Sequence, residues 1–150
     1  MFKNYFLTSG FGVGETKLLS FDRALRSAKI ENYNLVKISS ILPPGVEKKE
    51  KIDLAPSSIL YIAYGYLISD KKGETISAVC GVAIPEKEKD IGIIMEWSSY
   101  EKKEKGIEEV KRMLETAMND RGIRIKKIEI VSIERKVKDF TCVFAGCAIF

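Results

Sequence analysis

The segment ILYIAYGYLISDKKGETISAVCGVAI, residues 59–84, decides the fold class of this chain. Residues 59–68 and 75–84 are rich in isoleucine, valine and tyrosine, a composition typical of β-strands. Asp70-Lys-Lys-Gly73 between them has the composition of a turn, so the segment predicts a β-hairpin.

Strand-like runs recur along the chain, at residues 35–41, 91–97, 125–137 and 140–150. Two helices are expected. Ser20 is the expected N-cap of the first, over residues 20–29. The second, over residues 100–121, carries an apolar stripe at helical spacing: Ile107, Val110, Met113, Leu114, Ala117 and Met118. More strand than helix, joined by short turns, predicts an α+β sandwich with mainly antiparallel sheets.

The composition limits both the size and the chemistry of the protein. With 150 residues and 45% hydrophobic content, residues 1–150 fit a single globular domain. The 25 basic and 21 acidic residues are interspersed, which gives little reason to expect nucleic-acid binding. The chain has no histidine, which excludes a Ser-His-Asp triad and histidine-based zinc sites. No metal is expected, and catalysis must use carboxylates, hydroxyls, lysines or an acquired cofactor.

The cysteines and the hydropathy pattern indicate a cellular compartment. Cys80, Cys142 and Cys147 are odd in number and lie among apolar residues, so we expect buried free thiols in a reducing compartment. No stretch approaches the roughly 20 apolar residues of a membrane span. A cytoplasmic location without membrane contact is therefore expected.

Two adjacent serines, Ser39 and Ser40, lie between an apolar run and Pro43-Pro44. If Ser40 Oγ attacks the carbonyl carbon of Ser39, the peptide becomes an ester. Elimination then gives a dehydroalanine, and its hydrolysis releases ammonia and leaves a pyruvoyl group. Ser57-Ser58 and Ser98-Ser99 are rival pairs, but neither has the trailing Pro-Pro. Residues 46–53 are mostly charged and are expected to form an exposed loop, whose mobility could let the two ends of a cut chain separate.

Three further polar residues have both a structural and a functional interpretation. Glu96 ends a strand that is apolar on both faces, where loss of hydration would raise its pKa and keep a proton available; alternatively it reaches solvent or pairs with a lysine. Asp22 falls in the first turn of the expected helix, where the helix dipole favours a carboxylate. Asn34 is either a turn residue or a site residue. Gly12-Val-Gly14 lacks the remaining residues of a dinucleotide or P-loop motif, so no nucleotide site is predicted there.

Taken together, several ordered blocks resemble the pyruvoyl-dependent arginine decarboxylase family. The blocks are Gly14-Glu-Thr16, Phe21-Asp-Arg-Ala-Leu25, Asn34-Leu-Val-Lys-Ile-Ser-Ser-Ile-Leu-Pro-Pro44, Ala63-Tyr-Gly-Tyr66, Gly73-Glu-Thr-Ile-Ser-Ala78, Val82-Ala-Ile-Pro85 and Ile94-Met-Glu-Trp97. The resemblance implies a four-layer αββα sandwich that assembles as a homotrimer with active sites between subunits. It also implies self-cleavage into a β chain, residues 1–39, and an α chain, residues 40–150, that begins with a pyruvoyl group made from Ser40.

The resemblance further implies roles for individual residues. The substrate amine would form a Schiff base with the pyruvoyl group, and Glu96 would protonate the carbanion left by carbon dioxide, giving agmatine. Asn34 and Ser39 would assist cleavage or line the site, and Asp22 would bind the substrate guanidinium. Asn34 and Ser40 are six residues apart, about 20 Å along an extended strand, so Asn34 would serve a neighbouring subunit's Ser40.

Two alternatives stay open at this point. Arg23 beside Asp22 could pair with that carboxylate and compete with a guanidinium, so the substrate could be another amino acid, such as aspartate or histidine. A non-catalytic member of the family would instead be an uncleaved trimer that binds a small amine.

Overall fold

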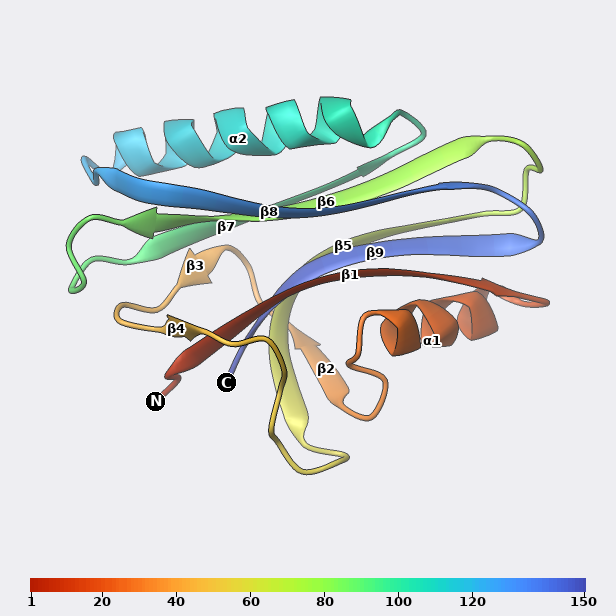
Figure 1. Cartoon of the computed structure of the whole chain (residues 1–150), viewed down its shortest axis with the longest axis horizontal. Helices are drawn as coiled ribbons and strands as arrows, with labels where there is room; N and C mark the ends of the chain where they lie inside the picture. The colour runs from red at the N-terminus through yellow and green to blue at the C-terminus, as the bar shows by residue number, and fades with distance from the viewer.

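The computed structural model describes all 150 residues as a four-layer sandwich, helix–sheet–sheet–helix (Figure 1). One sheet has the strand order β2 (Asn34–Lys37), β5 (Ile59–Ser69), β9 (Phe140–Ile149), β1 (Asn4–Gly14), β4 (Glu47–Lys48). The other has the order β3 (Ile41–Leu42), β7 (Gly92–Ser99), β6 (Thr75–Pro85), β8 (Ile125–Lys136). Only β2 and β4 pair in parallel with their neighbours. The expected αββα sandwich with mainly antiparallel sheets is confirmed.

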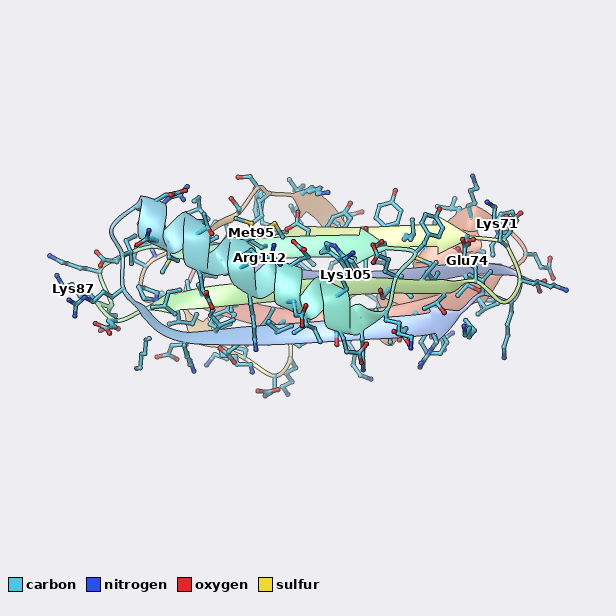
Figure 2. All side chains as sticks on the ribbon, turned by 90° about the horizontal axis from the view of Figure 1, so that it is seen from above. Lys71, Glu74, Lys87, Met95, Lys105 and Arg112 are labelled. Atoms are coloured by element: carbon cyan, nitrogen blue, oxygen red, sulfur yellow. The ribbon has the colours of Figure 1, made fainter.

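The predicted hairpin of residues 59–84 is wrong, although both of its strands exist. β5 pairs with β2 and β9, while β6 pairs with β7 and β8, so the Asp70–Gly73 turn carries the chain from one sheet to the other. Figure 2 shows Lys71 and Glu74 at this crossing, and Lys87 at the opposite end of the sandwich. Both strands are apolar on both faces, and such strands can stack across a core as well as pair edge to edge.

The first helix, α1 (Lys17–Ser27), begins earlier than predicted. Thr16 is its N-cap, because the Thr16 side chain accepts a hydrogen bond from the Leu19 N–H at 3.1 Å. Ser20 is buried inside the helix and donates to the Lys17 carbonyl at 2.7 Å. The prediction that Ser20 caps the helix and that Asp22 lies in its first turn is therefore wrong. Asp22 lies one turn further along, on the exposed side.

The glycines of β1 let α1 lie directly on the five-stranded sheet. A Cβ at Gly12 would stand 2.3 Å from the Ser20 carbonyl oxygen, and one at Gly10 would stand 2.6 Å from the Ala28 nitrogen. Neither space would accommodate a side chain. This close approach of helix and strand accounts for the glycines that superficially suggest a nucleotide loop.

The core consists of three apolar layers. The middle layer lies between the sheets and includes Leu7, Ala63, Val82, Ile94 and Val143. Phe6, Leu25 and Phe144 belong to the layer beneath α1. The third layer packs the predicted stripe of α2 (Lys103–Asp120) on the four-stranded sheet, with Val110, Leu114 and Met118 fully buried.

The charged side of α2 faces outward, as Lys105 and Arg112 show in Figure 2. Neither α1 nor α2 is long and apolar enough to cross a membrane. The three cysteines are free and buried, as predicted. Burial raises the pKa of Cys142 to about 12.

Candidate active site

The chain crosses from one sheet to the other at Ser39–Ser40. The Ile38 N–H donates to the Ile62 carbonyl of β5 at 3.1 Å, and the Ser40 carbonyl accepts from the Ile94 N–H of β7 at 2.7 Å. A continuous strand over residues 35–41 was the wrong prediction, because β2 ends at Lys37 and β3 begins at Ile41 in the other sheet. Ser39 and Ser40 form the link between the two.

This link leaves the Ser39–Ser40 peptide unusually free. The Ser39 carbonyl and the Ser40 N–H take part in no backbone hydrogen bond, and Ser39 is exposed while Ser40 is half-buried. A carbonyl without a ladder partner can be approached by a nucleophile, and water can reach it for a later hydrolysis. The position therefore suits the cleavage that the sequence suggests.

Glu96 lies on β7, opposite Cys80 of β6, and points into the space between the two sheets. It shares its face of the strand with Ile94, two residues earlier, whose N–H binds the Ser40 carbonyl. Gly65 of β5 lies against it, since a Cβ built on Gly65 would be 3.3 Å from Glu96 Cγ. The five ion pairs of the chain do not include Glu96.

Burial raises the pKa of Glu96, and the positive charge of Lys37 partly opposes this rise. The expectation that Glu96 loses hydration agrees with this shift, which favours the protonated carboxyl. A protonated carboxyl between the sheets can act as a general acid.

Lys37 is a site residue that sequence reasoning missed. Its Nζ lies 4.9 Å from the centroid of the Tyr64 ring, which packs in the layer beneath α1, and the charge of Lys37 lowers the pKa of Glu96. No carboxylate forms an ion pair with Lys37. The only feature of the sequence that could have indicated Lys37 is its place three residues before Ser40. The effect of its charge on Glu96 depends on how the two sheets stack, which the sequence does not show.

Asn34 lies at the opposite end of β2 from the crossing. It is opposite Ile59 in the strand register, and its side-chain amide donates to the Ser57 carbonyl at 2.9 Å. Asn34 therefore lies next to the turn that contains Ser57, and it is distant from Ser40 of the same chain.

Asp22 lies on α1, beyond the outer face of the five-stranded sheet, and forms no ion pair. Arg23 does not pair with it, because the Arg23 guanidinium donates to the Val13 carbonyl at 2.6 Å. The neighbouring Phe21 ring packs on Tyr66 of β5 at 5.0 Å between centroids. Asp22 is therefore available to an external cation.

A single chain thus brings together Ser39, Ser40 and Glu96 but leaves Asn34 and Asp22 at other places on the surface. A pocket of about 420 Å³ lies beside β3, but its lining residues, such as Pro43 and Glu86, do not include Ser40 or Glu96.

Comparison with known proteins shows the family of the chain. The chain matches the family model described as "Pyruvoyl-dependent arginine decarboxylase" over residues 4–150. It is 40% identical to the pyruvoyl-dependent arginine decarboxylase of Methanocaldococcus jannaschii over 144 residues, which cover 96% of this chain and 87% of that protein. The protein of the same name from Methanococcus aeolicus is 41% identical over 144 residues, with the same coverage. The one from Pyrococcus furiosus is 41% identical over 128 residues, covering 84% of this chain and 80% of that protein.

Proposed function

The chain belongs to the pyruvoyl-dependent arginine decarboxylase family, and from this premise we propose that it is a self-processing enzyme that converts L-arginine to agmatine and carbon dioxide. The observation that carries the proposal is the crossing at Ser39–Ser40. Its Ser39 side is exposed, the Ser39 carbonyl has no ladder partner, and hydrogen bonds to different sheets fix the chain on both sides.

Self-processing begins at this peptide. Ser40 Oγ attacks the Ser39 carbonyl carbon and its proton moves to the departing nitrogen, so an ester replaces the amide. Elimination breaks the ester bond, which leaves Ser39 as a new carboxyl end and residue 40 as a dehydroalanine. Addition of water then releases ammonia. The products are a β chain of residues 1–39 and an α chain of residues 40–150.

The surroundings of residue 40 fit a pyruvoyl group. This group has fewer atoms than the serine from which it forms, so the half-buried position accommodates it. The Ile94 N–H binds the carbonyl of residue 40 and so holds that residue against β7. When present, a pyruvoyl group supplies an electrophilic carbonyl that withdraws electrons from the substrate as carbon dioxide leaves.

Glu96 is the proposed proton donor. It lies half-buried between the sheets beside Gly65, and burial raises its pKa, so a proton is available for the substrate α-carbon. Lys37 limits that rise through its charge.

We infer that Asp22 and Asn34 act across a subunit boundary in a homotrimer of processed protomers. Asp22 would bind the guanidinium, and Arg23 does not compete because it is engaged with Val13. Asn34 would reach the Ser40 region of a neighbour. Support comes from large apolar side chains exposed around the β2 edge, a pattern typical of a subunit interface: Val36, Ile41, Ile59 and Tyr61. The free cysteines favour the cytoplasm as the location.

Purified protein tests the proposal. Intact-mass measurement should show two fragments divided between Ser39 and Ser40, the larger blocked at its amino end, and incubation with arginine should release agmatine. Turnover of another amino acid without agmatine would overturn the substrate. A single full-length chain after prolonged incubation would overturn the enzyme and favour a binding protein.

A further inference from the structure

A cluster of three side chains closes the edge of the sandwich formed by β4 and β8. Glu129 of β8 accepts hydrogen bonds from Tyr5 of β1 and from Lys48 of β4, the latter at 2.8 Å. The Glu129 side chain is 17% exposed and the Lys48 side chain 41% exposed. Lys127 Nζ adds a weaker contact at 3.7 Å. Glu129 is thus a half-buried carboxylate that joins the two sheets.

The pKa shifts in this cluster agree with strong hydrogen bonds from Lys48 and Tyr5 to an ionised Glu129. Burial alone would raise the pKa of Glu129, but hydrogen bonds from Lys48 and Tyr5 and the charges of Lys48 and Lys127 outweigh it, and the net shift is downward. Burial and the contact with Glu129 raise the pKa of Tyr5. Glu129 therefore stays ionised and Tyr5 stays a donor.

The cluster lies at the end of a short arm that begins at the cleavage site. The arm, residues 40–48, forms β3 on β7, turns at Pro43-Pro44-Gly45, and forms β4 on β1. Figure 1 shows it following one end of the sandwich from sheet to sheet. Gly45 has a φ of +71°, which allows the turn.

The backbone alone gives this arm few contacts. β3 and β4 each have two residues, and β4 is tied to β1 by the Glu47 N–H to the Lys3 carbonyl and the Lys49 N–H to the Tyr5 carbonyl, both at 2.9 Å. Glu47, Lys48 and Lys49 are exposed residues. Apart from the packing of Leu42 and Val46 in the core between the sheets, the bond from Lys48 to Glu129 is the only side-chain hydrogen bond that ties β4 to the other sheet.

We propose that Glu129, by binding Lys48 and Tyr5, anchors the arm of residues 40–48 and so keeps residue 40 at the edge of β7 before and after cleavage. The functional part of this inference rests on the proposed self-processing. Tyr5 belongs to residues 1–39 and Lys48 and Glu129 to residues 40–150, so the cluster also ties together the two products. All three are positioning residues and do not touch the reacting atoms.

Hydrogen exchange tests the anchor in a chain that cannot cut itself. In a Ser40→Ala background, Glu129→Gln and Lys48→Met should speed amide exchange at Glu47 and Lys49 by about tenfold or more, while amides of β9 keep their protection. Lys49→Met is the matched control, since it removes the neighbouring charge, which pairs only with exposed Glu47. If Glu129→Gln also speeds amide exchange in β9, the substitution has disturbed the whole fold, and the exchange measured in Lys48→Met then decides whether the anchor exists. Unchanged exchange at Glu47 and Lys49 would overturn the anchor.

The cleavable chain tests positioning. A time course of intact mass should show cleavage slowed by roughly tenfold in Lys48→Met and restored in Lys48→Arg, which keeps the charge-assisted bond. The positioning role would be overturned if Lys48→Met speeds amide exchange in the arm but the chain is still cut at the normal rate and residues 1–39 stay bound to residues 40–150. If the parent chain never cuts, the proposed function fails, while the exchange experiment still decides the anchor.

Discussion

The Ile94 backbone nitrogen lies 2.7 Å from the Ser40 carbonyl oxygen, and this hydrogen bond attaches Ser40 to the strand that carries Glu96. Ile94 and Glu96 share a face of β7, so the residue that would become the cofactor and the residue that would donate the proton are positioned by the same strand.

Ser40→Ala should abolish cleavage, because it removes the hydroxyl that is proposed to attack the Ser39 carbonyl. Intact mass should show one chain. Ser57→Ala and Ser98→Ala, in the rival serine pairs, should still give both fragments. Appearance of the same two fragments in Ser40→Ala would contradict the proposed nucleophile.

Glu96→Gln should lower kcat by about 10²- to 10⁴-fold, because the amide cannot donate a proton as the carboxyl does. Cleavage and the oligomer should persist, as checked by intact mass and size-exclusion chromatography. Glu108→Gln, on the exposed side of α2, serves as the control. Near-normal turnover in Glu96→Gln would remove Glu96 from the mechanism.

The pH dependence of kcat should follow the protonation of Glu96. The protonated form is the active one, and burial raises its pKa, so turnover should be full at low pH and fall as the pH rises through that pKa. The charge of Lys37 lowers the same pKa, so Lys37→Met should move the falling limb to higher pH. Lys49→Met should leave the limb in place. If the pH at which kcat falls is unchanged in Lys37→Met, or is lower, the assigned role of Lys37 is contradicted.

Asp22→Asn should raise KM for arginine more than it lowers kcat, because the guanidinium loses a charged partner while the proton donor is intact. Steady-state kinetics checks this. Mixed oligomers of Asp22→Asn and Glu96→Gln chains should recover part of the activity, because some sites then combine an intact Asp22 with an intact Glu96. Absence of recovery despite verified mixing would contradict a site shared between subunits.

Acid should weaken the Glu129 cluster. The folded pKa of Glu129 is lowered from 4.5, so its contribution to the free energy of unfolding is present above that value and is lost as the pH falls through the folded pKa. Between about pH 6 and about pH 3, uncut Ser40→Ala protein should therefore lose more stability than the same protein with Glu129→Gln. Urea unfolding at both pH values measures the difference, and equal losses would contradict the shift.

The sequence by itself determined the chemistry available and the type of most elements. The absence of histidine excluded a Ser-His-Asp triad and histidine-based zinc sites, and the apolar faces around Glu96 indicated a carboxyl with a raised pKa. Period and composition located the long strands and α2, because side-chain burial in these elements repeats along the chain itself.

The tertiary structure decided which strands pair, because pairing depends on contacts between residues far apart in sequence. Composition alone could not show that β5 and β6 belong to different sheets, or that the run of residues 35–41 breaks after Lys37. Lys37 near Glu96 and the Glu129 cluster were hidden for the same reason. Residues 46–53 looked like a charged, mobile loop, and only the stacking of the two sheets places Lys48 beside a half-buried carboxylate 81 positions later in the chain.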